Sequence, residues 1–165
     1  MLKFIYRYWD VDFSDLLDVY SESLILEGAE RYPYRSEYDQ RILAEEDLRE
    51  YLRFFFSNGG ILAIWLHDQQ PVSAVRLEPY QNGYLVAGLE TAPNHRGKGF
   101  ATLLMNSVCE FLQARTPLTL YSHVKRSNKR SLRVHEKCGF GSYRDYAVLL
   151  DGSVDTKSDT MIREL

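Results

Sequence analysis

The chain has 165 residues, a formal net charge of −3 at pH 7 and a 45% share of hydrophobic residues. We expect one domain over residues 1–165, because this length supports a substantial core and the twelve Tyr and eight Phe argue against disorder. The acidic balance argues against a general nucleic-acid binder, and no apolar run reaches the length of a membrane span. The first residues do not resemble a signal peptide. The two cysteines, Cys109 and Cys138, lack CxxC spacing and favour reduced thiols in a cytoplasmic protein.

The first third of the chain reads as one strand and two helices. We expect the strand over residues 2–9 and the first helix over 13–28, where apolar residues recur at helical spacing and a glycine ends the pattern. A loop over 30–38 follows, since Pro33 disfavours helix at the residue before it. The second helix is expected over 39–57.

The rest of the chain alternates between strand and helix patterns, and Asn82-Gly83 is a strong hairpin signal. Strands are expected over 61–67, 72–77, 84–90, 118–124, 140–150 and 157–163, and helices over 100–115 and 128–137. The order β-α-α-β-β-β-α-β-α-β-β predicts an α/β fold with a mixed, mostly antiparallel sheet flanked by helices.

Residues 89–102, LETAPNHRGKGFAT, join a strand to a helix through a glycine-containing turn. Such a helix start can bind an anion, because its first N–H groups lack partners within the helix and the helix dipole makes this end positive. The loop does not match a triphosphate-binding motif, since Lys98 is followed by Gly99 rather than by Ser or Thr. It does not match the dinucleotide fingerprint either, since Thr102 stands at the third glycine position.

The six residues from Arg96 to Ala101, RGKGFA, resemble the signature Q/R-x-x-G-x-G/A, with which GCN5-related N-acetyltransferases (the GNAT family) bind a pyrophosphate. A second stretch is similar to another signature of that family: an Asn, a small residue three later, an aromatic residue seven later and a Gly-Phe pair. These positions hold Asn128, Ser131, His135 and Gly139-Phe140. The resemblance covers both motifs and the order of elements from residue 2 to residue 150.

The resemblance implies that acetyl-CoA is the co-substrate. Its pyrophosphate would lie on the backbone of the glycine loop, that is on Arg96, Gly97, Lys98, Gly99, Phe100, Ala101 and Thr102. The pantetheine arm would pair with backbone groups of Leu89 and Thr91, and Asn128 would bind the cofactor near that arm. Asn128 is also well suited to cap a helix, and the two roles are compatible.

The implied reaction is transfer of an acetyl group to a primary amine by direct attack in a ternary complex. Glu90 is the first candidate for the general base and Glu78 the second, although strand alternation turns Glu90 away from Leu89 unless a bulge intervenes. His135 stands where the family often has a tyrosine acid, with Tyr143 as a fallback. In the alternative interpretation, each glutamate is a structural or solvated carboxylate and His135 is a packed or surface residue.

Other interpretations remain open at this stage. The fold can belong to a catalytically idle acyl-CoA sensor or interaction module. The basic run over 125–130 is read as a solvated turn, or as a contact for the 3′-phosphate of CoA, rather than as an RNA site. We expect no metal, because the four histidines lack ligand spacing.

The acceptor is the least determined part of the sequence analysis. We expect a small-molecule or peptide amine as partner, no nucleic acid and no membrane, and we leave a homodimer open. Carboxylates and aromatic rings near the first loop suit a cationic amine. They are Glu27, Glu30, Tyr32, Tyr34 and Tyr38.

Overall fold

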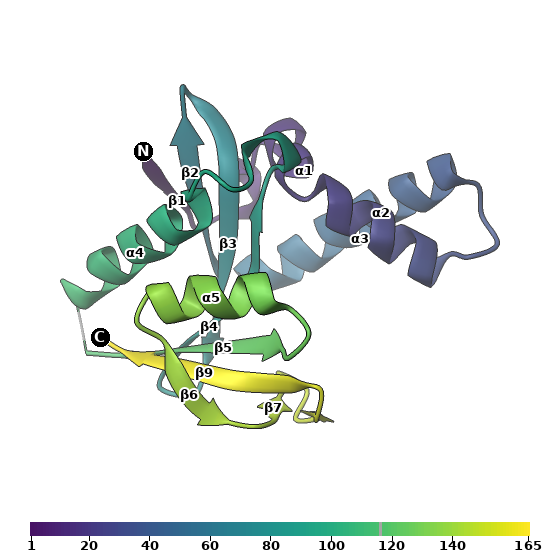
Figure 1. Cartoon of the computed structure of the whole chain (residues 1–165). Coiled ribbons are helices and arrows are strands. Elements are labelled where there is room, and N and C mark those ends of the chain that lie inside the picture. The colour runs from purple at the N-terminus through teal and green to yellow at the C-terminus, as the bar shows by residue number, and fades with distance from the viewer. Residues whose placement is uncertain (116) are drawn as a thin grey trace.

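The computed structural model describes residues 1–115 and 117–165. Within these residues, seven strands form one sheet in the order β1-β2-β3-β4-β5-β9-β6 (Figure 1). The strands are β1 (Leu2–Ile5), β2 (Ile61–His67), β3 (Gln70–Tyr80), β4 (Gly83–Thr91), β5 (Thr119–Lys125), β6 (Gly141–Arg144) and β9 (Ser158–Glu164). β4 and β5 run parallel, and the other neighbouring pairs run antiparallel. The prediction of a mixed, mostly antiparallel sheet is confirmed.

Helices cover both faces of this sheet (Figure 1). They are α1 (Phe13–Val19), α2 (Ser21–Arg31), α3 (Glu37–Ser57), α4 (Phe100–Gln113) and α5 (Lys129–Lys137), with two short 3-10 helices, η1 (Tyr8–Asp10) and η2 (Pro93–His95). Strand β2 shows how the sheet separates two cores, since Leu62 and Ile64 belong to the core under α1–α3 and Ala63 belongs to the core under α4. The period-2 alternation of strand side chains produces this division. Among the described helices, none has both the length and the apolar character that crossing a membrane requires.

The first predicted helix is in fact two helices. The helical conformation is interrupted at Tyr20, which lies between α1 and α2 with φ −91° and ψ 9°. Gly28 does not end the helix as expected but lies inside α2, where a Cβ atom would come within 2.5 Å of the Gln40 carbonyl oxygen on α3. The glycine therefore allows close packing of α2 on α3, and tertiary contact rather than helix termination explains it.

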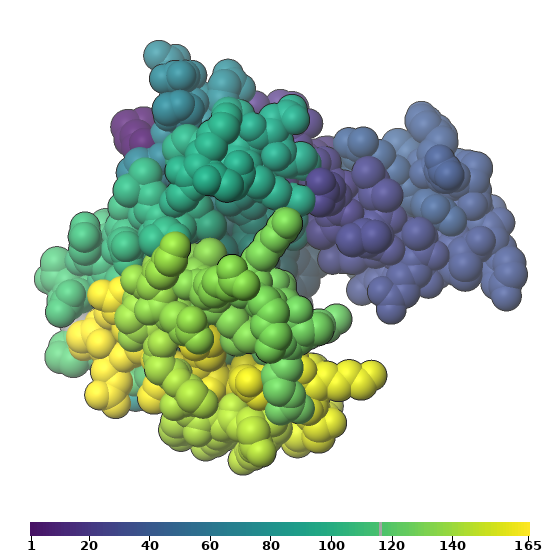
Figure 2. All heavy atoms as spheres, viewed as in Figure 1, coloured from purple at the N-terminus to yellow at the C-terminus, as the bar shows by residue number. Residues whose placement is uncertain are grey.

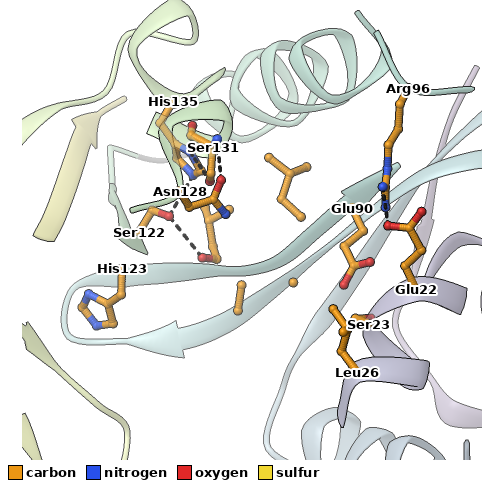
Figure 3. Close-up of a pocket in the computed structure, with 14 residues that line it drawn as sticks. Glu22, Ser23, Leu26, Glu90, Arg96, Ser122, His123, Asn128, Ser131 and His135 are labelled. Carbon is orange, nitrogen blue, oxygen red and sulfur yellow. Dashed lines mark hydrogen bonds and ion pairs between the residues drawn. The ribbon is translucent and has the colours of Figure 1, made fainter. Parts of the chain in front are cut away.

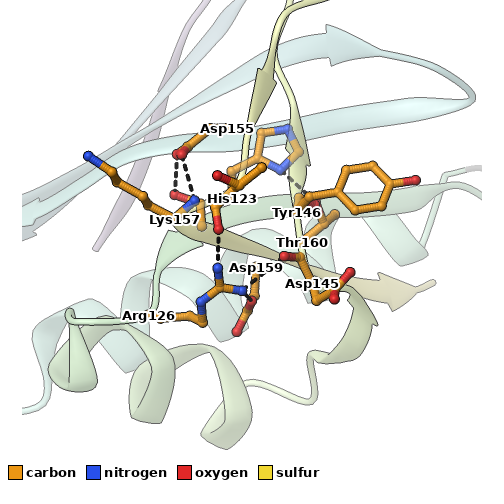
Figure 4. A network of polar contacts seen from close by, with 10 residues as sticks. His123, Arg126, Asp145, Tyr146, Asp155, Lys157, Asp159 and Thr160 are labelled. Atoms are coloured by element: carbon orange, nitrogen blue, oxygen red, sulfur yellow. Dashed lines mark hydrogen bonds and ion pairs between the residues drawn. The ribbon is translucent and has the colours of Figure 1, made fainter.

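The stretch over 140–150 is not one continuous strand, as the sequence predicted. β6 ends at Arg144, and β7 (Ala147–Val148) pairs with β8 (Val154–Asp155) as a separate small hairpin. Side chains hold this irregular segment in place (Figure 4). Arg126 donates 2.9 Å hydrogen bonds to the Asp145 carbonyl and the Asp159 carboxylate, and the Thr160 hydroxyl donates to the Tyr146 carbonyl at 2.7 Å. Arg126, from the basic run, thus has a structural role.

Candidate active site

Strands β4 and β5 separate halfway along their length. Their parallel pairing runs from Gly83 opposite Thr119 to Val86 opposite Ser122 and ends there. On its other side, β4 stays paired with β3 beyond this point, with Glu90 opposite Ala74. Within the part of the chain that the structure describes, the edge of β4 that faces β5 therefore has no strand partner from this fork onward.

A bulge in β4 lies directly beyond the fork. The register against β3 shifts so that Arg76 faces Ala87 while Ala74 faces Glu90. Gly88 has φ +56°, and a Cβ atom there would lie 2.7 Å from Arg76 Cζ, so this position requires glycine. Since paired residues share a face of the sheet, Glu90 points to the side covered by α1–α3, whereas Leu89 packs against the core under α4.

A cavity of about 390 Å³ opens at the fork, between α2, β4, β5 and α5. Five residues predicted for the site line it: Leu89, Glu90, Arg96, Asn128 and His135. Figure 3 shows Asn128 and His135 on one side of it and Glu90 and Arg96 on the other. The surface is hollowed here, between the purple-blue α2 helix and the green to yellow α5 and C-terminal strands (Figure 2).

The glycine loop supplies a row of unpaired backbone donors. Gly97 and Gly99 have φ values of +74° and +84°, and a Cβ atom on either would meet nothing within 4 Å. In the described part of the chain, the N–H groups of residues 97–102 have neither a backbone acceptor nor a side-chain cap. Glycines in the left-handed conformation, open space and free donors at the start of α4 are the features of an anion site.

Arg96 anchors this loop rather than pointing freely into solvent. Its Nε donates to the Thr91 carbonyl at 3.1 Å, and its guanidinium forms an ion pair with Glu22 on α2. The Thr91 hydroxyl lies 3.1 Å from Ser73 Oγ, so the predicted Thr91 is held against β3. Lys98 is exposed, and the Phe100 ring packs on His67 with centroids 4.9 Å apart.

Asn128 is the N-cap residue of α5, which confirms the expectation that it suits a helix cap. Its Oδ1 accepts a 3.1 Å hydrogen bond from the Ser131 N–H, which is an N-cap. No partner for its Nδ2 group is found among the described residues, and the side chain lines the cavity. One side chain can therefore cap the helix with its oxygen and bind a ligand with its nitrogen.

His135 is buried, with 2% of its surface exposed, behind Ser122. Its Nδ1 lies 2.8 Å from the Ser131 carbonyl and must donate, because a carbonyl only accepts. Its Nε2, 2.8 Å from Ser122 Oγ, is then the acceptor in the neutral ring. Burial lowers the pKa of the His135 imidazole, which favours this neutral form. The sequence analysis missed Ser122, because the contact joins a strand to a helix and has no local pattern.

The two candidate carboxylates lie in different places. Glu90 lines the cavity, and burial raises the pKa of its carboxyl above the ordinary value, against the opposing charges of Arg76 and Arg96. Glu78 is buried, accepts a hydrogen bond from the Tyr51 hydroxyl and lies outside the cavity lining. Tyr143, the fallback acid, is 44% exposed and does not line the cavity either.

A second cavity of about 220 Å³ adjoins the first on the side of α1–α3. Ser23 and Glu90 line both cavities, so Glu90 stands on the wall between them. Glu27 lines the second cavity as well, whereas Tyr34 and Tyr38 are 99% and 76% exposed and do not. Arg76 also lines it, a residue that the sequence analysis did not single out.

The family follows from a match that covers most of the chain. Residues 15–140 match the family model described as acetyltransferase (GNAT) family. The chain belongs to the GNAT family of acetyltransferases. The resemblance recognised in the two motifs is therefore confirmed, and the free donors at the start of α4 lie where the GNAT signature stands.

Solved structures share the GNAT fold over the whole chain. A PaiA N-acetyltransferase from Thermoplasma acidophilum, in complex with coenzyme A, aligns with TM-score 0.68 and 16% identity over 100% of this chain and 99% of that one. A ribosomal-protein-alanine N-acetyltransferase from Brucella melitensis aligns with TM-score 0.64 and 16% identity over 100% and 98%. A spermidine N-acetyltransferase chimera from Vibrio cholerae and hSSAT aligns with TM-score 0.62 and 23% identity over 98% and 93%. No curated protein sequence matches significantly.

Proposed function

We propose that this protein transfers an acetyl group from acetyl-CoA to a primary amine, by direct attack in a ternary complex. The observation that carries the proposal is the row of free N–H groups over residues 97–102, placed beside a fork between two parallel strands. A diphosphate spreads its charge over several oxygens, and preset backbone donors at a helix start suit it without a charged side chain.

The residues present fit acetyl-CoA. The glycine loop would hold the pyrophosphate, and the edge of β4 beyond Val86, which has no strand partner there among the described residues, would pair through Leu89 and Thr91 with the amide groups of the pantetheine arm. The Thr91 carbonyl also accepts from Arg96 Nε. The Nδ2 group of Asn128 faces the same cavity. Bound acetyl-CoA supplies a thioester carbonyl, which is open to attack by an amine.

Glu90 is the proposed general base. A lysine-like amine has a pKa near 10.4, so roughly one molecule in 10³ is neutral at pH 7, a deficit of about 4.6 kcal/mol. A carboxylate with a raised pKa accepts a proton near neutral pH better than an ordinary one does. The position of Glu90 between the two cavities lets it receive a proton from an amine that enters through the second cavity, directly or through one water.

Ser122 and His135 form the proposed acid pair. When the His135 Nε2 atom carries a proton, that proton passes to Ser122 Oγ, and the Ser122 hydroxyl proton passes into the cavity toward the leaving sulfur. Burial lowers the pKa of His135, so the ring is neutral at rest and must first take up a proton on Nε2 from the solvent; the resulting imidazolium is then a stronger acid than an ordinary one. The Ser131 carbonyl keeps the Nδ1 proton in place and orients the ring throughout.

The test is the release of CoA thiol from acetyl-CoA in the presence of a panel of amines, with mass detection of the acetylated product. We expect amine-dependent thiol release that exceeds the release without amine. Binding of acetyl-CoA without acetylation of any amine would contradict the proposal and support the alternative, an idle acyl-CoA sensor.

A further inference from the structure

Among the described residues, no carboxylate forms a close ion pair with Arg76, although the charges of Glu78 and Glu90 act on it from a greater distance. It lies on β3 beneath the β4 bulge, against Gly88, and its Cζ lies 4.8 Å from the centroid of the Tyr51 ring and 5.6 Å from that of Tyr20. Its Nε is buried and has no hydrogen-bond partner. Across residues 1–115 and 117–165, the Arg76 side chain forms no hydrogen bond and no ion pair with a carboxylate.

Such a cation is costly for a folded protein. A guanidinium does not deprotonate in proteins, and a charge removed from water requires a partner. The nearby carboxylates do not fill this need directly, because Glu78 accepts from the Tyr51 hydroxyl and Glu90 faces the two cavities. A planar guanidinium near two aromatic rings offers a pair of donors whose geometry matches a carboxylate.

Arg76 and Glu90 face the same cavity from neighbouring strands. Ala74 stands opposite Glu90, and Arg76 lies two residues further along β3, hence on the same face of the sheet. Such diagonal neighbours are roughly 7–8 Å apart, and their long side chains approach more closely. The wall of the second cavity thus offers a cation within it and a carboxylate at its opening to the first cavity.

The other charges around this cavity are arranged differently. Arg31 donates to Asp47 at 2.9 Å, and the Tyr32 hydroxyl donates to the same carboxylate at 2.8 Å. Arg31 and Asp47 are therefore already paired with each other. Glu27 lines the cavity and has no ion-pair partner among the described residues. Arg76 is therefore the cation that remains open to an anionic group, while Glu27 and Glu90 remain open to a cationic one.

We propose that the acceptor is an amine that also carries a carboxylate, a molecule of the amino-acid type. Arg76 binds its carboxylate in the second cavity, and its amino group reaches Glu90 at the opening to the first. The inference rests on the proposed function. In the reaction, the nitrogen bonds to the acetyl carbon and the carbon–sulfur bond breaks. Of the two protons lost by the ammonium group, one goes to the solvent through Glu90 and one balances the proton that the sulfur receives.

The test compares each amino acid with its own carboxamide. The carboxamide keeps the shape, removes the negative charge and lowers the pKa of the amine, so a preference for the acid cannot come from a more neutral amine. We expect wild-type kcat/KM to be at least about tenfold higher for the acid of the best pair, since the charge-assisted bidentate contact exists in the acid alone. Equal or higher values for the carboxamide would overturn the inference.

Two variants link this preference to one residue. Arg76→Met keeps much of the volume and removes the charge, and we expect the acid-to-amide ratio to fall to about one. Arg76→Lys keeps a charge without the planar fork and should retain part of the preference. Arg53→Met is the matched control, because Arg53 also lies over an aromatic ring, that of Tyr8, but is exposed and outside both cavities.

Stability separates a binding role from a structural one. Replacing an unpaired, half-buried charge by Met should leave the unfolding temperature unchanged or raise it, whereas removal of a structural ion-pair partner would lower it. An equal loss of activity toward acid and carboxamide in Arg76→Met would overturn the inference. If this variant does not fold, the comparison of acid and carboxamide with the wild-type protein alone tests the inference. Turnover of carboxylate-free amines only would refute this inference and leave the proposed function standing, whereas no turnover of any amine would refute both.

Discussion

His135 Nε2 lies 2.8 Å from Ser122 Oγ, which connects helix α5 to strand β5 at the residue where β5 stops pairing with β4. The contact places an imidazole behind a hydroxyl that lines the cavity. His135, from the second GNAT signature, therefore contacts the fork through Ser122, which is not part of that signature.

Ser122→Ala tests this relay. We expect kcat with a good amine to fall by roughly 10²-fold or more, since removal of a positioned proton donor has effects of this order. The variant also leaves His135 Nε2 without a partner, which costs about 1–3 kcal/mol of stability. Ser142→Ala, at an exposed position, is the control. An unchanged kcat in Ser122→Ala would remove the pair from the mechanism.

Glu90→Gln tests the general base through the pH profile. Burial raises the pKa of Glu90, so wild-type log(kcat/KM) should rise steeply with pH until this carboxyl has ionised, at a midpoint above that of an ordinary glutamate. Glu90→Gln should lower kcat/KM by about 10²-fold and remove the part of the pH dependence that comes from this carboxyl. The remaining rise with pH then reflects only the deprotonation of the substrate amine. A profile with the same shape in both proteins would show that Glu90 is not the base.

The raised pKa of Glu90 also predicts how the stability of the protein depends on pH. Because the folded-state pKa of Glu90 is raised, its contribution to stability is complete below the unfolded-state pKa and is lost as the pH rises through the folded-state value. Glu90→Gln should therefore unfold at an equal or higher temperature than the wild type at pH 7. Thermal unfolding at pH 4 and pH 7 measures the difference, which should shrink at the lower pH; a variant less stable at pH 7 would contradict the assignment.

Gly99→Ala tests the glycine loop. An alanine in the left-handed conformation costs about 1–2 kcal/mol, and its methyl group would project into space that is otherwise open beside the free N–H groups. We expect the variant to unfold a few degrees lower and to lose stabilisation by acetyl-CoA. Gly152→Ala is the matched control, with φ +83°, equally open surroundings and a position in a distant turn. An equal acetyl-CoA effect in the two variants would contradict the role of the loop.

Gly28→Ala tests the packing of α2 on α3. Helix propensity alone would make alanine stabilising by about 1 kcal/mol. A Cβ atom would lie 2.5 Å from the Gln40 carbonyl oxygen, so we expect a net destabilisation of roughly 1–3 kcal/mol, as in other overpacked sites. Chemical denaturation measures the free energy of unfolding of both proteins. A variant more stable than the wild type would show that Gly28 is not needed for the close approach of α2 to α3.

What could be predicted from the sequence was local. The glycine loop is one contiguous segment whose turn, helix start and free donors follow from the order of its residues. The period of the apolar residues likewise predicted the strands at the centre of the sheet and the approximate positions of α3, α4 and α5, whereas it merged α1 and α2 into one helix. Asn128 could be read as a helix cap from its neighbours alone.

What could not be predicted depends on segments distant in the chain. Ser122 and His135 meet only when α5 packs on β5. Among the described residues the Arg76 side chain has no ion-pair partner, and the nearby Glu78 instead accepts a hydrogen bond from the Tyr51 hydroxyl. The insertion of β9 between β5 and β6 has no signature within either segment. Tyr20, at the break between α1 and α2, also contacts a distant strand, since its hydroxyl donates to the Gly88 carbonyl at 2.8 Å.

Thermal unfolding with acetyl-CoA, with NADH as the control, tests the central claim most directly. A ligand at 100 times its Kd adds about 2.7 kcal/mol of stability, which for a chain of this size is a shift of roughly 5–11 °C. We predict this shift with acetyl-CoA and none with NADH. No shift at millimolar acetyl-CoA would show that residues 97–102 are only the start of a helix, and that the GNAT fold here does not bind the co-substrate on which the proposed function depends.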